Sequence, residues 1–289
     1  MTATTVGSIP PDVAPPDDPF RYGWRVVRRD IGDGHLEEEL IPLRLIDLLH
    51  PEEGDQVIQN YAHQRHVRYL ADVFQARVAG DPHAVVLADM RIAWDVPELK
   101  AHGPDVMVIF DVRELRNWGT FDVAQEGTRP AIIVEVTSPE TRKFDLYDKV
   151  EAYDRAGVPL YIVVDAVERQ GKTVIRLLGY ERVMSVYQPL IPDERGWLWL
   201  APLRIWLGVR DNEVYCFDEQ GKQIGDYTEL VEHLVEAEER AATAEERAAT
   251  AEERAAIAEE RAAAEAAARA AAEARVRALE AELRRLRGE

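Results

Sequence analysis

The chain has 289 residues and carries 54 acidic against 35 basic side chains, which gives a formal net charge of −19. That charge argues against a protein that coats nucleic acid through a broad basic face, and no apolar run approaches the roughly 20 residues that cross a bilayer. The N-terminal segment lacks the basic and apolar regions of a secretory signal, and the single cysteine, Cys216, cannot form an internal disulfide. We therefore expect a cytoplasmic protein with no membrane segment.

Composition divides the chain into three segments. Residues 1–19 concentrate prolines among small and acidic residues, so we expect a disordered N-terminal lead. Residues 20–227 mix apolar and polar residues with aromatic residues throughout, which predicts a packed α/β domain. Residues 228–289 form a near-regular repeat of Ala, Glu and Arg, which predicts a long helix.

Within the α/β segment, two stretches have helical spacing and several have the character of strands. Residues 56–78 predict a long amphipathic helix. Residues 145–156 predict a second helix, which Gly157 ends as a left-handed cap. Strand-like runs occupy residues 84–94, 105–110, 131–136, 160–165 and, less regularly, 173–224. The order strand, helix, strand over residues 131–165 favours a right-handed crossover between two parallel strands.

Two acidic residues in apolar strands require an explanation. Glu135 is embedded in the run AIIVEV, where an ionised carboxylate loses hydration unless a charge compensates it. Asp105 opens the preceding apolar strand. Ile133 and Glu135 share one face of their strand, as Asp105 and Met107 share one face of theirs. If the strands are neighbours, the two carboxylates can meet at one edge of the sheet, where they need a shared proton or a cation.

A lysine can supply part of that charge. Lys149 lies on the helix that follows Glu135, and Asp145 precedes it by four residues, so Asp145 can hold Lys149 in place. Oxygen ligands such as the two carboxylates also suit Mg²⁺. Spacing alone leaves a simpler alternative open, in which Glu135 and Lys149 form a structural ion pair and Asp105 caps a turn.

Residues 104–165 contain several short motifs in a defined order. The motifs are Pro104-Asp105, then Val134-Glu135-Val136-Thr137-Ser138-Pro139, then Asp145, Lys149 and Tyr153, then Ala156-Gly157-Val158-Pro159, and finally Val164-Asp165. This order resembles the Uma-type restriction endonuclease family of the PD-(D/E)XK nuclease superfamily. The resemblance implies an α/β, restriction-endonuclease-like core, in which helices flank a mixed sheet, followed here by a long C-terminal coiled-coil helix.

The resemblance also implies an activity and the residues that carry it. It implies hydrolysis of nucleic-acid phosphodiester bonds, with DNA as the expected substrate and Mg²⁺, or alternatively Mn²⁺, as cofactor. Asp105 and Glu135 would be catalytic residues that bind the metal through their carboxylates, and the backbone carbonyl of Val136 would complete the coordination. Thr137 stands where the superfamily has lysine. The resemblance implies that Lys149 takes this role, with Lys143 as the second candidate.

One further ligand is left open. Nucleases of this superfamily often add an acidic or polar residue from the helix that precedes the sheet. Glu53, Gln59 and His63 are the candidates near residues 56–78, and the alternative is that none of them takes part. A helical histidine is also common as a surface or core residue.

The C-terminal segment repeats with a period of seven, as AEERAAT, and Leu279, Leu283 and Leu286 set the register. In that register alanines occupy most a and d positions, arginines fall at g and Glu245 and its equivalents at e. A single solvated helix is the simple alternative, because alanine is the best helix former. The charge placement favours association between helices, so we predict a parallel homodimer through residues 228–289, with a partner protein as the competing possibility.

Together these observations predict a metal-dependent endonuclease that dimerises through a C-terminal coiled coil. The alternative is a catalytically inactive binding or scaffold protein that keeps the nuclease fold and acts through the coiled coil. Thr137 and the acidic surface motivate that alternative, whereas the joint presence of Asp105, Glu135 and Lys149 favours the enzyme.

Overall fold

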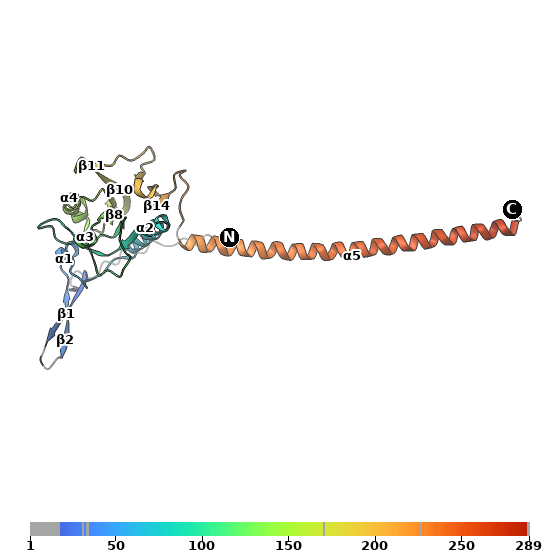
Figure 1. The fold of residues 1–289 in the computed structure, drawn as a ribbon, viewed down its shortest axis with the longest axis horizontal. Coiled ribbons are helices and arrows are strands. Elements are labelled where there is room, and N and C mark those ends of the chain that lie inside the picture. Colours follow the sequence, from blue (N-terminus) through green and yellow to red (C-terminus); the bar gives the residue numbers. More distant parts are fainter. Residues whose placement is uncertain (1–17, 31, 33–34, 170, 226, 288–289) are drawn as a thin grey trace. The chain divides into compact units, whose positions relative to one another are not determined.

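In the computed structural model, the chain forms two units, an α/β unit and one long helix (Figure 1). The structure describes residues 18–30, 32, 35–169, 171–225 and 227–287. The division between the units falls between residues 226 and 227. The expected N-terminal lead lies outside the described residues except for residues 18 and 19.

Six strands form the central sheet of the α/β unit, in the order β11-β10-β9-β8-β6-β4. The strands are β4 (Val85–Ala88), β6 (Val106–Ile109), β8 (Pro130–Val136), β9 (Leu160–Arg169), β10 (Lys172–Val183) and β11 (Val186–Pro189). Strands β8 and β9 run parallel, and the other neighbouring pairs run antiparallel. The sheet is therefore mixed, and the α/β fold class predicted from the sequence is confirmed.

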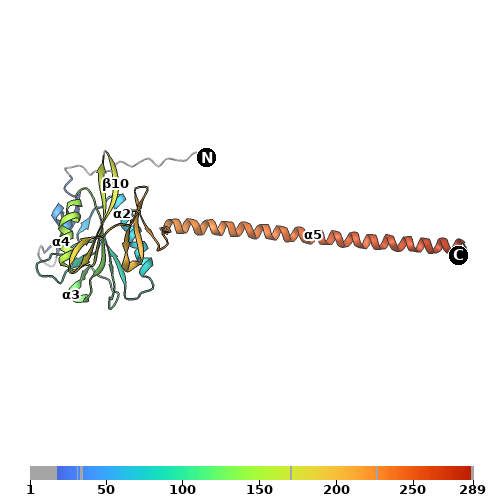
Figure 2. The same cartoon turned by 90° about the horizontal axis from the view of Figure 1, so that it is seen from above.

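Helices cover both faces of this sheet. Helix α2 (Tyr61–Val78) packs on the face that carries Val106, Val108, Ile132 and Val134. Helix α4 (Lys149–Arg155) packs on the face that carries Met107, Ile109 and Ile133. Figure 2 shows α2 and α4 on opposite sides of the sheet. Successive residues of a strand point to opposite faces, so the near-continuous apolar runs of β6 and β8 supply both layers of the core.

Helix α2 begins later than the spacing of residues 56–78 predicts. Asn60 is the N-cap, and its side chain accepts a hydrogen bond of 2.9 Å from the backbone N–H of His63. The two residues of β3 (Gln56–Val57) instead pair with β1 (Gly23–Asp30). An asparagine at this position satisfies a free N–H of the first helical turn, which explains why the helix starts at Tyr61.

The single strand expected over residues 84–94 is two strands in two sheets. Strand β4 ends before Asp89, because a φ of +50° at this residue is incompatible with a continuous strand. Strand β5 (Arg91–Ala93) follows it and pairs in parallel with β7 (Thr120–Asp122). The bend therefore separates the central sheet from a second, two-stranded sheet.

The crossover between β8 and β9 begins with a wide helical turn. Residues Phe144–Asp148 form a π-helical segment, η1, which leads directly into α4. The helix predicted over residues 145–156 is thus present, but its first turn is not α-helical. Gly157 follows the last turn with φ +74°, the left-handed conformation that the sequence predicts at this cap.

The remaining short elements surround the central sheet. They are β2 (Leu36–Pro42), α1 (Leu45–Leu49), α3 (Val123–Glu126), β12 (Leu198–Leu200), η2 (Ala201–Leu203), β13 (Ile205–Arg210) and β14 (Glu213–Phe217). Strands β12, β13 and β14 form an antiparallel sheet. Strands β1 and β2 form a hairpin that projects from the α/β unit (Figure 1).

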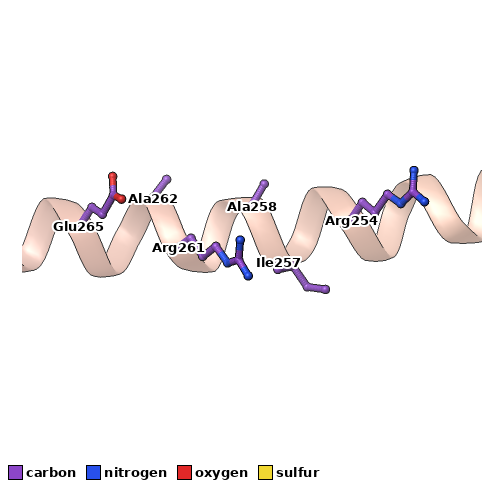
Figure 3. A pocket seen from close by; sticks show the side chains of 6 residues that line it. All are labelled: Arg254, Ile257, Ala258, Arg261, Ala262 and Glu265. Atoms are coloured by element: carbon purple, nitrogen blue, oxygen red, sulfur yellow. The ribbon is translucent and has the colours of Figure 1, made fainter.

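The second unit consists of helix α5 (Tyr227–Arg287), which has 61 residues. Its large apolar side chains among residues 234–285 are exposed, including Val276, Leu279 and Leu283 at 52–54%. Figure 3 shows Ala258 and Ala262 pointing to one side of the helix and Ile257 to the other. Within the described ranges, none of the helices combines the length and the apolar character needed to cross a membrane.

Candidate active site

The two acidic residues singled out in the sequence lie side by side at one end of the central sheet. Val106 of β6 is paired with Val134 of β8, which places Asp105 opposite Glu135. The backbone N–H of Asp105 lies 3.4 Å from Oε2 of Glu135, and the backbone N–H of Val136 donates to Oδ2 of Asp105 at 2.6 Å. Asp105 and Glu135 are 8% and 1% exposed. The structure therefore brings together two carboxylates that are almost completely buried.

Lys149 reaches the same place from the crossover helix. Its Nζ lies 2.8 Å from Oε2 of Glu135 and 2.8 Å from Oδ1 of Asp145. Tyr153, one turn further along α4, donates a hydrogen bond of 2.7 Å to Oε1 of Glu135. By contrast, Lys143 is exposed and precedes the helical turn. Of the two lysines considered from the sequence, Lys149 is the one that contacts Glu135.

Burial and charge shift the pKa values of these groups in different directions. Burial raises the pKa of Glu135 to about 8, although Lys149 opposes the shift. Burial would also raise the pKa of Asp105, but His63 and Lys149 outweigh it and the pKa is lowered. Burial would lower the pKa of Lys149, but Asp145 and Glu135 outweigh it and the pKa is raised. The ammonium is therefore charged, whereas burial beside other carboxyl groups favours a proton on Glu135.

This cluster of buried carboxyl groups fits a divalent cation, which would take the place of the proton that burial favours on Glu135. A carboxylate loses much of its hydration on burial, and nearby positive charge offsets that cost. Asp105 and Glu135 present oxygen atoms from neighbouring strands, and such ligands suit Mg²⁺ and Mn²⁺. The N–H of Val136 already binds Asp105, which places the backbone of this residue beside the pair. Its carbonyl stays a predicted ligand.

A third acidic residue, Asp89, was not expected from the sequence. It occupies the bend after β4, where its backbone N–H donates to the carbonyl of Asp105 at 3.0 Å. One ligand atom each from His63, Asp89 and Asp105 lies within 4.8 Å of the others. Although Asp89 is exposed, local desolvation and the charge of Asp105 raise its pKa. An acid in the middle of the apolar run at residues 84–94 was the one signal that could have indicated this position.

The three candidates for a further ligand lie in different places. Nε2 of His63 is 3.3 Å from Oδ1 of Asp105. Burial would lower the pKa of His63, but the Asp105 carboxylate outweighs it and raises the pKa to about 9. Gln59 donates to Oδ1 of Asp89 at 2.8 Å, so it contacts the cluster through Asp89. Glu53 instead lies against Gly119.

Thr137, two residues after Glu135, has a structural role. Its Oγ1 accepts a hydrogen bond of 2.9 Å from the backbone N–H of Ala166 and lies 3.4 Å from Oδ1 of Asp165. Asp165 is fully buried and binds Arg142 and Arg176. Thr137 therefore helps to join β8 to β9, while Lys149 supplies the positive charge beside Glu135.

Comparison with known proteins identifies the family. Residues 54–210 match the family model Uma2, described as "Putative restriction endonuclease". The chain is also similar to a crystal structure from Anabaena variabilis, described as a "putative nuclease belonging to DUF820". The two share 14% sequence identity with a TM-score of 0.30, and the similarity covers 50% of this chain and 74% of that chain. A search of curated proteins found no match. Because the family match spans more than half of the chain, the protein belongs to the Uma2 family.

Proposed function

We propose that this protein is a divalent-metal-dependent endonuclease that hydrolyses DNA at the cluster of Asp105, Glu135 and Lys149. The meeting of two buried carboxylates and one buried ammonium, where β6 begins and β8 ends, carries this proposal. A structural ion pair would need Glu135 and Lys149 alone. Asp105 and Asp145 add two further buried carboxyl groups, and ionising all three together costs stability unless a cation compensates their charge.

Each residue of the cluster has a role that its contacts support. Asp105 and Glu135, with the Val136 carbonyl, would hold the cation. Tyr153 fixes the orientation of the Glu135 carboxylate through its hydrogen bond. Lys149, held by Asp145, can donate a hydrogen bond to the attacking water or to a phosphoryl oxygen, where negative charge develops in the transition state. A bound divalent cation supplies positive charge for the phosphoryl oxygens and lowers the pKa of water.

The net charge of −19 limits how such an enzyme holds its substrate. Affinity for DNA depends on neutralising phosphates, and each such contact makes binding weaker at higher salt. We expect weak, salt-sensitive binding through a local site, so pairing two copies of the α/β unit would help by raising the effective concentration of the second site.

Helix α5 is the proposed means of that pairing, as a parallel homodimer through residues 228–289. The exposed Val276, Leu279 and Leu283 support the proposal, because apolar side chains at heptad positions bury area when two helices associate. The same register places Glu265 at d and Arg269 at a. Arg269 pairs with Glu273 within its own helix. We therefore expect the stability of the dimer to be concentrated near the C-terminal end.

A plasmid-nicking assay tests the nuclease. The full chain is incubated with supercoiled DNA and Mg²⁺ or Mn²⁺, and the native protein is compared with Glu135→Gln and Lys149→Met. Glu219→Gln is the matched control, because Glu219 forms a partly exposed ion pair with Arg204. We expect the rate to fall about 10²-fold or more in the two site variants and to stay at the native value in the control.

The same assay separates the enzyme from the inactive scaffold. Nicking by native protein that neither site variant reduces would point to a contaminating nuclease and contradict the proposal. Absence of nicking by folded native protein, with both cations and at low salt, would favour the scaffold that acts through its coiled coil. Thermal unfolding of each variant establishes that a loss of activity is not a loss of folding.

A further inference from the structure

We propose that His63, Asp89 and Asp105 form a metal-binding set of one nitrogen and two carboxylate ligands, which prefers a transition-metal cation such as Mn²⁺ to Mg²⁺. The inference deepens the proposed nuclease function, since Asp105 belongs to both ligand sets. The sequence leaves His63 open as one candidate among three, and the set adds Asp89 at the bend after β4, which the sequence did not indicate.

The geometry of the three side chains supports this set. One ligand atom from each residue lies within 4.8 Å of the other two. Three separate elements supply them: the first turn of α2, the bend at Asp89 and the residue before β6. The backbone N–H of Asp89 binds the carbonyl of Asp105 at 3.0 Å, and this hydrogen bond fixes the two acids relative to each other.

His63 has an unused nitrogen in this cluster. The residue is 9% exposed, and its buried Nε2 has no hydrogen-bond partner among the described residues. The distance of 3.3 Å to Oδ1 of Asp105 is that of an ion pair without hydrogen-bond geometry. His66, one turn later, instead uses its Nε2 to bind Glu213 at 2.9 Å. A buried polar atom without a partner is costly, and a cation between the ligands would give this nitrogen one.

The other carboxylate of the site is already in use. Oε1 of Glu135 accepts from Tyr153 and Oε2 lies at 2.8 Å from Lys149. By contrast, Oδ1 of Asp105 lies 3.3 Å from Nε2 of His63, and Asp89 offers a ligand atom within 4.8 Å of one from each of these residues. Asp89 is exposed to solvent and thus provides an entry path, and Gln59 orients its carboxylate through a hydrogen bond of 2.8 Å. The buried ligand atom without a hydrogen bond, Nε2 of His63, therefore lies on this side of Asp105.

The ligand types determine the class of cation. Mg²⁺ prefers oxygen ligands in octahedral geometry, whereas imidazole nitrogen suits the first-row transition metals. Mn²⁺ accepts both ligand types and can support phosphoryl chemistry. The competing explanation is an ion pair between protonated His63 and Asp105 with no metal. In that case His63 would contribute to stability and would not affect the choice of cation.

Manganese binding to the full chain tests the set without relying on catalysis. After chelation of bound metals, Mn²⁺ is titrated and followed by electron paramagnetic resonance, with Mg²⁺ as competitor. Pulsed measurements of electron spin echo modulation detect a nitrogen ligand directly. The variants are His63→Gln and Asp89→Asn, and the matched control is His66→Gln. If His66→Gln does not fold, His83→Gln, at an exposed histidine, replaces it.

We expect native protein to bind one Mn²⁺ with a nitrogen ligand, and at least about tenfold more tightly than Mg²⁺. His63→Gln should abolish the nitrogen signal and most of the preference for Mn²⁺. Asp89→Asn should weaken both cations about tenfold, and the control should behave like native protein. Absence of the nitrogen signal from native protein, or an unchanged preference in His63→Gln, would overturn the proposal in favour of the ion pair.

The outcomes separate this proposal from the proposed function. If Mn²⁺ binds through His63 but the native protein nicks no DNA, the metal set stands and the nuclease proposal fails. If DNA is nicked in a manner that depends on Glu135 while the bound cation has only oxygen ligands, the nuclease proposal stands and the His63 set fails.

Discussion

Replacing the buried Asp165 by asparagine should destabilise the α/β unit strongly. Asp165 is 0% exposed, and it accepts hydrogen bonds from Arg142 at 2.6 and 3.0 Å and from Arg176 at 2.7 Å. Asparagine keeps the shape and one acceptor oxygen but removes the negative charge that holds both guanidinium groups. The two arginines come from different elements, the crossover and β10, so the change loosens their attachment to β9.

The size of the effect follows from the number and exposure of these contacts. A hydrogen bond to a charged group contributes about 1.5–3 kcal/mol. The arginine side chains are 35% and 46% exposed, so solvent screens part of the interaction. We therefore expect the free energy of unfolding to fall by about 2–4 kcal/mol at neutral pH.

The dependence on pH provides a second readout. Burial would raise the pKa of Asp165, but its hydrogen bonds to Arg142 and Arg176 outweigh burial and lower the pKa. A lowered pKa in the folded state contributes stability above the unfolded pKa of about 3.9. That contribution is lost as the pH falls through the folded value, so the difference between native protein and Asp165→Asn should shrink below about pH 4.

Urea unfolding followed by tryptophan fluorescence measures this change. All six tryptophans precede residue 207, so the signal reports on the α/β unit and not on α5. Glu219→Gln, at a partly exposed ion pair with Arg204, should stay within about 0.5 kcal/mol of native protein. A loss of less than about 1 kcal/mol for Asp165→Asn, or a difference that does not change at acidic pH, would refute this account of the two arginine contacts.

Three further predictions concern single side chains elsewhere in the molecule. Tyr153→Phe leaves Oε1 of Glu135 without its 2.7 Å donor and should cost about 1–3 kcal/mol in urea unfolding, whereas no loss would show that water replaces the hydroxyl. Gly208→Ala would place a methyl group 2.5 Å from the ring of Trp197, so stability should fall by about 1–3 kcal/mol with a changed fluorescence spectrum, and an unperturbed spectrum would contradict the close approach. Leu283→Glu should convert the proposed dimer to a monomer in light scattering, and equal masses for the two proteins would contradict association through this end of α5.

The part of the site built from regular strands could be predicted from the sequence. Glu135 stands out because an acid is rare in a buried apolar run, and the period of two places it on the face that α4 covers. The helix after β8 and its end at Gly157 have strong local signals, so the approach of Lys149 followed from the order of the elements. These inferences depend on residues close to one another in the sequence.

The rest of the site depends on contacts between distant segments. Asp89 enters the cluster because the chain bends there with a positive φ, and the apolar residues on both sides favour one uninterrupted strand. His63 approaches Asp105 only after α2 has packed on the sheet. Arg176 reaches Asp165 across the pairing of β9 and β10. The repeat in residues 228–289 predicts a helix from local propensity, but the identity of its partner depends on a second chain.

The π-helical turn η1 restricts changes in the length of the chain as well as in its composition. A residue of an α-helix turns by about 100° relative to its neighbour. Deletion of one residue from this segment can be absorbed by conversion of the wide turn to an ordinary α-helical turn. Deleting both Leu146 and Tyr147 would rotate Lys149 by about 100° away from Glu135, while every side chain of the cluster remained in the sequence. Connections of this kind usually tolerate insertions and deletions, but this one sets the angular position of a buried ammonium. Relatives that are shorter here by two residues would need a compensating change to keep the lysine beside the carboxylates.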